Sequence, residues 1–186
     1  MDPQSALNTS LFLGESYGFW IQTGAIFLSA AAAAGALFYS GKQVKHLRQQ
    51  NESNEKLARM RATIDLVLHE NANEHLTECR KSFGIMTDNK EDFAKYACGD
   101  LTDHQEVNDV LFPVLNSYEF MAAGVRTGAF DEEIYKRMKK SIVIRDWKAL
   151  SGYVMQLRAK EKRDAIYIEF ECMAKKWEKE PPNSAD

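Results

Sequence analysis

Two histidines, His69 and His75, stand in the segment HENANEH, where a zinc site would be the natural hypothesis. A zinc-binding helix of the hydrolytic type carries two histidines four residues apart with a glutamate between them, so that both face one side. Here the histidines are six residues apart and position 73 is asparagine. The chain also lacks the Glu-x-x-His pairs of di-metal helical bundles. We therefore expect neither a metal site nor a cofactor.

Two arginines stand where a charge is costly unless it is paired. Arg126 ends an apolar segment, and Arg145 interrupts the apolar run IVIRDW. Because guanidinium groups bind phosphate and carboxylate well, Arg126 and Arg145, with Tyr118 and Tyr153, are candidate ligands for a small anion such as a nucleotide. The alternative is an internal ion pair with one of three carboxylates: Asp131, Glu119 or Asp146.

Three cysteines, Cys79, Cys98 and Cys172, are widely spaced and form no CxxC pair. This pattern fits neither a disulfide framework nor a zinc site. Cys98 and Cys172 have no histidine beside them in the sequence, so we expect buried structural thiols rather than nucleophiles. No catalytic residue is predicted, and an enzyme is the less favoured interpretation.

The first structural element that the sequence predicts is an uncharged segment from Phe19 to Tyr39. A helix of that length reaches about 30 Å, the thickness of the bilayer hydrocarbon. The segment lacks the polar face that a soluble helix would need. It also lacks the basic residues that precede the apolar core of a signal peptide. Aromatic residues near both ends are typical of membrane interfaces. We predict a transmembrane helix at residues 17–40.

All 24 Lys and Arg residues follow position 41. Because basic residues flank spans on the cytoplasmic side, we expect segment 1–16 outside a bacterial inner membrane and the rest in the cytoplasm. Lys42, Lys45 and Arg48 would contact anionic lipid. Of the 27 acidic residues, only Asp2 and Glu15 precede the basic ones, so 25 acids accompany 24 bases. This balance argues against a nucleic-acid partner.

Small residues four positions apart recur through the alanine-rich part of the span. They allow two helices to approach closely, although alanine can also be simple filler. Gln22 can hydrogen-bond across the same interface. The pattern predicts a homo-oligomer that packs through these positions: Gln22, Ser29, Ala30, Ala31, Ala33, Ala34 and Gly35.

Helical periodicity dominates the chain after the span. We expect a helix from about 42 to 82, with a polar stalk at 41–56 and a docked stripe formed by Leu57, Met60, Ile64, Val67 and Leu68. A short helix should cover 91–98, and the strongest pattern covers 107–125. After Gly128, Asp131 can cap a helix that reaches 157, with a break near 141–143 left open. The last helix covers 166–177 and stops at Pro181.

The predicted fold is therefore all-α: a single N-terminal transmembrane helix, a long stalk helix and a cytoplasmic helical bundle at 57–180, followed by a disordered tail at 181–186. Eight apolar residues from three helices should form the centre of the core: Leu111, Leu115, Tyr118, Met121, Trp147, Val154, Phe170 and Trp177.

Three blocks, VLNSYEFMAAGVRTGAFDEEIYKRM, IRDW and YIEFECMAKKW, resemble in order and spacing a family of uncharacterised bacterial proteins that carry a domain of unknown function after one N-terminal span. The likeness covers roughly Lys42 to Trp177 and leaves the span outside. It implies a membrane-anchored helical domain, and it supplies no site residue.

These features favour a membrane-anchored oligomeric interaction or effector protein, with envelope stress or phage defence as the suggested setting. The expected partners are membrane lipid, further copies of the chain, and a cytoplasmic protein or small anionic signal. The alternative is an enzyme or nucleotide-sensing domain that acts on a phosphate-bearing ligand through an Arg126/Arg145 pocket.

Overall fold

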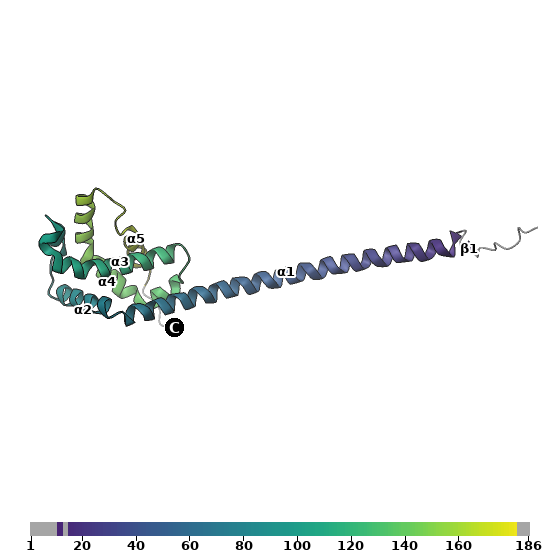
Figure 1. Ribbon diagram of the computed structural model, residues 1–186, viewed down its shortest axis with the longest axis horizontal. Coiled ribbons are helices and arrows are strands. Elements are labelled where there is room, and N and C mark those ends of the chain that lie inside the picture. Colours follow the sequence, from purple (N-terminus) through teal and green to yellow (C-terminus); the bar gives the residue numbers. More distant parts are fainter. Residues whose placement is uncertain (1–10, 13–14, 182–186) are drawn as a thin grey trace, which may run out of the picture. The chain divides into compact units, whose positions relative to one another are not determined.

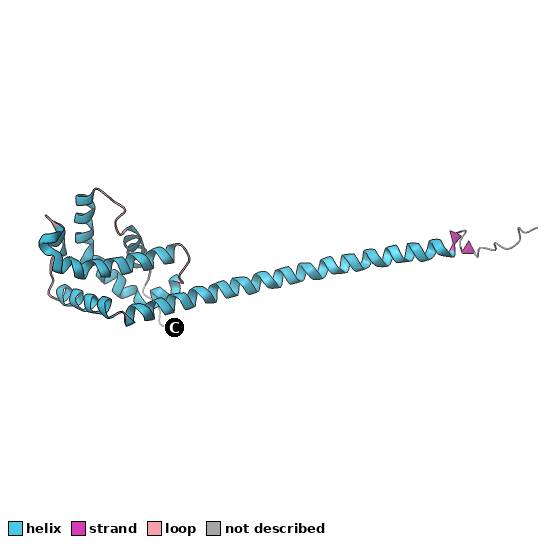
Figure 2. Cartoon of the chain, in the orientation of Figure 1, coloured by secondary structure: helices cyan, strands magenta, loops and turns pink. Residues whose placement is uncertain are grey.

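The computed structural model describes residues 11–12 and 15–181. It divides into two units, Met1–Asn54 and Glu55–Asp186. Most of the predicted external segment 1–16 and nearly all of the tail 181–186 lie outside the described residues. The all-α prediction is confirmed, and Figure 2 shows helices connected by loops, with one very short pair of strands.

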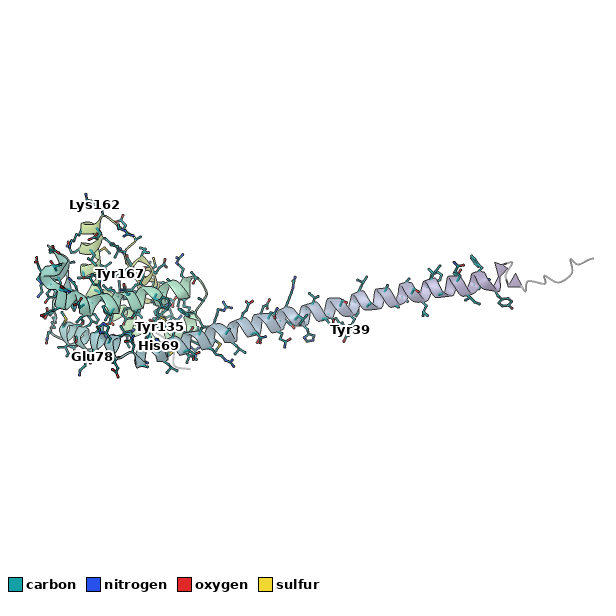
Figure 3. The ribbon with its side chains drawn as sticks, viewed as in Figure 1. Tyr39, His69, Glu78, Tyr135, Lys162 and Tyr167 are labelled. Carbon is teal, nitrogen blue, oxygen red and sulfur yellow. The ribbon has the colours of Figure 1, made fainter. Side chains whose placement is uncertain are left out.

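In the first unit, β1 (Leu11–Phe12) pairs antiparallel with β2 (Glu15–Ser16), and α1 (Tyr17–Ala72) follows at once. α1 is uninterrupted (Figure 1), so Gly41 does not end it, and the helix continues past residue 40. In this unit the helix is almost wholly exposed, and Tyr39 projects freely from it (Figure 3). α1 is long and apolar enough to cross a membrane.

The second unit contains the end of α1 and a bundle of four further α-helices, with two 3₁₀ segments between α2 and α3. Their bounds are α2 Glu74–Asp88, η1 Phe93–Ala97, η2 Leu101–His104, α3 Gln105–Arg126, α4 Glu132–Glu161 and α5 Ile168–Lys179. The expected helix to residue 82 is interrupted at Asn73, whose side chain accepts the Leu76 N–H at 3.0 Å and so begins α2.

Local signals explain the next helix ends. Gly128 has φ of 74°, a left-handed conformation that glycine adopts without strain, and α3 ends just before it. Asp131 caps α4 as predicted, because its carboxylate accepts the Ile134 N–H at 3.0 Å. α4 then continues to Glu161, so the break left open near 141–143 does not occur. α3 also runs through Pro113.

The start of α5 depends on a distant residue. Its N-cap, Tyr167, has a left-handed backbone and makes no side-chain capping bond. Instead Glu119 of α3 accepts the N–H groups of Glu169 and Phe170, at 3.3 and 2.8 Å. A carboxylate at a helix N-terminus satisfies unpaired donors and complements the helix dipole, so α3 and α5 are joined by a polar contact as well as by packing.

All eight residues predicted for the core are buried. Phe170 lies at its centre: its ring stacks on Tyr118 at 4.5 Å between centroids and meets Trp147 edge-on at 5.2 Å. Such aromatic pairs add about 0.5–1.5 kcal/mol to the effect of burial alone.

The predicted α1 stripe is largely wrong. Val67 is buried, but Leu57, Ile64 and Leu68 are exposed. The inward face also carries polar groups: the Thr63 hydroxyl accepts the Asp131 N–H at 2.8 Å. The prediction placed the buried face of α1 on its apolar residues. It missed the observed face because part of the contact with the bundle is made by hydrogen bonds.

Candidate functional site

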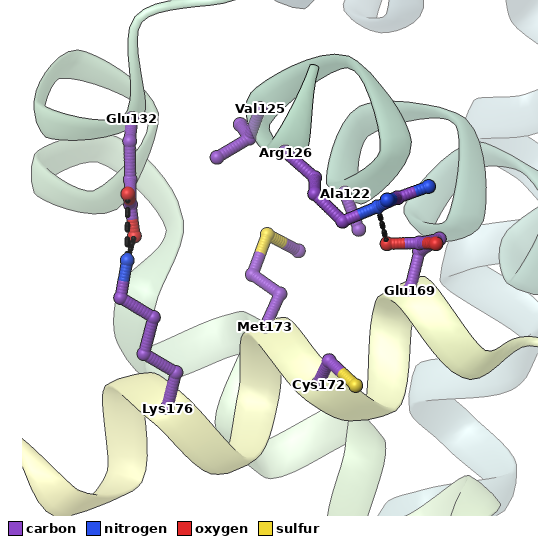
Figure 4. A pocket seen from close by; sticks show the side chains of 8 residues that line it. All are labelled: Ala122, Val125, Arg126, Glu132, Glu169, Cys172, Met173 and Lys176. Carbon is purple, nitrogen blue, oxygen red and sulfur yellow. Dashed lines mark hydrogen bonds and ion pairs between the residues drawn. The ribbon is translucent and has the colours of Figure 1, made fainter. Parts of the chain in front are cut away.

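A groove of about 350 Å³ lies where the end of α3 meets α5 and the first turn of α4 (Figure 4). Ala122, Val125 and Met173 form its apolar floor. Ala122 and Met173 are buried because they face the core, whereas Val125 is half-buried at the groove itself. The volume is at the lower end of the range for ligand pockets.

Two ion pairs flank this floor (Figure 4). Arg126 Nε lies 2.5 Å from a Glu169 carboxylate oxygen, and Lys176 Nζ lies 2.6 Å from Glu132 Oε1. Burial raises the pKa of Glu132, but hydrogen bonds from Lys176 and Trp177 outweigh it and leave the pKa lowered. Each charge in the lining is therefore matched, and the remaining polar group is the thiol of Cys172.

No histidine lines this groove, and Cys172 has no hydrogen-bonded base among the described residues. Nucleophilic catalysis needs such a base or a strongly perturbed thiol. The prediction that Cys98 and Cys172 are buried is wrong: both are exposed, and only Cys79 is buried. The arrangement suits the docking of an apolar side chain between charged walls better than bond chemistry.

A second group of polar side chains, the polar cluster, lies where α1, α2, α3 and α4 meet. It consists of Glu70, Arg80, Ser117, Tyr118, Lys139, Arg145 and Asp146. Arg80 Nη2 donates to Glu70 Oε2 and to Ser117 Oγ, both at 2.9 Å, and its guanidinium lies over the Tyr118 ring at 5.8 Å. Burial lowers the pKa of Arg80, but the hydrogen bond and the charge of Glu70, together with Tyr118 and Tyr135, more than offset this, so the pKa is raised and the group stays charged.

The α4 side of the polar cluster is built around Asp146, which is buried. The Tyr118 hydroxyl donates to Asp146 Oδ2 at 2.6 Å, and Arg145 Nε donates to Oδ1 at 2.8 Å. Burial and the Asp146 charge raise the pKa of Tyr118 well above its ordinary value, so the phenol stays protonated and acts as a donor.

The four predicted ligand residues do not share one site. Arg126 lines the groove, whereas Arg145 and Tyr118 belong to the polar cluster. Tyr153 is buried elsewhere and donates to Asn108 Oδ1 at 2.6 Å. The arginine side chains are also 68% and 60% exposed, so the expectation that they stand where an unpaired charge is costly is wrong for both. Of the proposed ion pairs, Arg145 with Asp146 is present, and Arg126 pairs instead with Glu169.

Sequence reasoning missed Glu70, Arg80 and Lys139. They belong to no motif, and charges are common on helix surfaces. A signal existed for Glu70, since it follows Thr63 and Val67 on one helix face at spacings of four and three. Arg80 and Lys139 stand at the same kind of spacing from apolar residues, but the groups that they contact lie on other helices, which the sequence does not show.

The predicted span residues all lie in α1. Ser29 donates its hydroxyl proton to the Ala25 carbonyl at 2.7 Å, which satisfies a group that would otherwise be costly in lipid. In the basic flank, Lys42 Nζ lies 4.8 Å from the centre of the Phe38 ring. Among the described residues, no three His, Cys, Asp or Glu side chains gather in a way that could hold a metal ion.

Comparison with known proteins gives a family and no activity. No curated protein and no solved structure matches the chain. A family model described as a domain of unknown function, DUF4760, matches residues 23–177. The match begins inside the apolar part of α1, so the expectation that the span lies outside the family likeness is wrong. Since the match covers most of the 186 residues, the chain belongs to the DUF4760 family.

Proposed function

We propose that this protein is a membrane-anchored oligomeric interaction protein of a bacterial inner membrane. Residues 17–40 span the bilayer, the N-terminus lies outside, and the helical domain works in the cytoplasm. The observation that carries the proposal is the one-sided charge: an uncharged stretch of α1 is followed by every Lys and Arg of the chain. Such asymmetry is the main sequence determinant of orientation.

The domain then serves as the interacting part, and its groove between α3 and α5 is the contact we assign to a partner protein. An apolar floor between matched ion pairs favours a partner that inserts one apolar side chain and exchanges hydrogen bonds at the rim. The enzyme alternative requires Arg126 and Arg145 in one pocket, whereas Arg126 lines the groove and Arg145 pairs with Asp146 in the polar cluster.

Oligomer formation through α1 is the second part of the proposal. The small residues of the span allow close helix packing. After the span, Leu57, Ile64 and Leu68 are exposed on one side of α1, at spacings of seven and four. Chains anchored with the same orientation present these residues in parallel, as in a two-stranded coiled coil.

Reporter fusions test the orientation. A reporter active only in the cytoplasm, fused after Asp186, should be active, and one active only in the periplasm should be silent. The reverse result, or recovery of the full chain in the soluble fraction without detergent, would refute the membrane placement.

Detergent mass measurement tests the oligomer. Changing Ala30, Ala34 and Gly35 together to leucine should lower the oligomer mass of the full chain, because leucine separates the helices. The matched control places leucine at Ala25, Ala32 and Ala36, which leaves the first three positions intact. Equal masses for both variants and the native chain would remove span packing from the proposal.

A further inference from the structure

The carboxylates of the polar cluster are already occupied. Glu70 accepts from Arg80 at 2.9 Å, and Asp146 accepts from both Arg145 and Tyr118 at 2.8 and 2.6 Å. Each of the two carboxylates is therefore paired with an arginine. Any further cation in the polar cluster lacks a carboxylate of its own to balance its charge.

Lys139 is such a further cation. On α4 it follows Tyr135 by four residues and precedes Asp146 by seven, so it lies between them on the same face of the helix. Tyr135 and Asp146 are buried there, and Lys139 is half-buried. Burial and the nearby Arg80 charge lower the pKa of Lys139. Among the described residues no carboxylate lies within ion-pair distance of its ammonium group.

Arg80 supplies a second unmatched donor. Its Nη2 atom makes two hydrogen bonds, but its Nε atom is buried and has no acceptor among the described residues. A buried donor without an acceptor carries a free-energy cost, because it has lost its hydrogen bond to water. An oxygen-rich anion would remove this cost and also neutralise Lys139.

We propose that Arg80 and Lys139 form a binding site for a phosphate monoester, with the Ser117 hydroxyl beside it. The three terminal oxygens of a monoester can accept from several donors at once, and its negative charge matches the ammonium group of Lys139. The half-buried side chain of Lys139 and the 22% exposure of the Arg80 side chain give the site an edge on the surface. The site lies within one unit and does not rest on the membrane placement or on the groove.

Calorimetric titration of the full chain in detergent tests the site with three probes: inorganic phosphate, adenosine 5′-monophosphate and a short-chain phosphatidic acid. Short-chain phosphatidylcholine, a diester, is the negative probe. We expect at least one monoester to bind. Binding of the nucleotide identifies a soluble ligand, and binding of phosphatidic acid alone identifies a lipid headgroup. If the native chain binds none of the three, the proposal is wrong.

Variants locate the binding. Lys139→Ala should weaken it by at least about tenfold, since a hydrogen bond between charged groups is lost, and Lys139→Arg should restore most of it. The control is Arg137→Ala on the same helix, whose side chain is exposed and pairs with Glu133. Arg80→Lys keeps the charge but removes Nε, and should also weaken binding. Binding that is unchanged in Lys139→Ala, with an unchanged unfolding midpoint, would place the ligand elsewhere and overturn the proposal.

Discussion

Replacing Gly124 with alanine should destabilise the protein, although this substitution normally stabilises a helix. Gly124 lies inside α3, where alanine is favoured over glycine by about 1 kcal/mol. A Cβ atom at this position, however, would overlap the ring of Phe130, which folds back over the helix after the turn at Gly128. The same turn is held by the Ala129 and Phe130 N–H groups, which donate to the Gly124 carbonyl at 2.9 and 3.1 Å.

The expected loss of stability is the sum of the interactions that the Phe130 ring loses when it moves away. Its ring packs at 5.8 Å from that of Phe120, a contact of about 0.5–1.5 kcal/mol. Moving the half-buried ring into water costs about 0.8–1.5 kcal/mol more, half the value for a fully buried side chain. Subtracting the helix gain of about 1 kcal/mol leaves a net loss of about 0.3–2 kcal/mol.

Gly84→Ala is the matched control, because Gly84 also lies inside a helix and a Cβ there would meet nothing within 4 Å. It should stabilise by up to about 1 kcal/mol. Urea unfolding of the full chain in detergent, followed by tryptophan fluorescence, measures both. In a Phe130→Ala background, Gly124→Ala should become stabilising. If it stabilises the native background as much as Gly84→Ala does, the reasoning about Phe130 is refuted.

Two further results are expected from the same unfolding assay. Trp147→Ala should cost about 3–5 kcal/mol, because the side chain is buried against Phe170 and truncation leaves a cavity; a loss near zero would contradict its place in the core. For Glu171, burial raises the pKa, but hydrogen bonds from Lys175 and Arg158 outweigh it and lower the pKa below the ordinary 4.5. Its contribution is therefore present above pH 4.5 and is lost as the pH falls through the lower folded value. Glu171→Gln should flatten this acid limb, and an unchanged pH profile would show that the ion pair adds nothing.

The apolar core was readable from the sequence because each helix buries one face. Leu111, Leu115, Tyr118 and Met121 recur at helical spacing, and the structure buries all of them. The cap at Asp131 was also readable, since a cap acts on its own next turn. Such signals are local, and they survive whatever the neighbouring helices do.

The buried face of α1 could not be predicted from the sequence in this way. Leu57, Ile64 and Leu68 looked like a buried stripe and are exposed, while Thr63 and Glu70 face inward. Whether a polar residue faces inward depends on a partner elsewhere in the chain, here the Asp131 backbone and the Arg80 guanidinium. No periodicity within α1 contains that information.

The sequence by itself determined the all-α class, the uncharged helix near the N-terminus and the core of the bundle, because composition and spacing control how each helix divides apolar from polar surface. Only the tertiary structure decided how the charges combine. Arg126 and Arg145 lie in different sites, and Arg126 forms its ion pair with Glu169. Glu70, Arg80 and Lys139 come from three different helices and lie close together only in the folded domain. Ion pairs and anion sites depend on distances between residues far apart in the chain, and those distances exist only after the helices have packed.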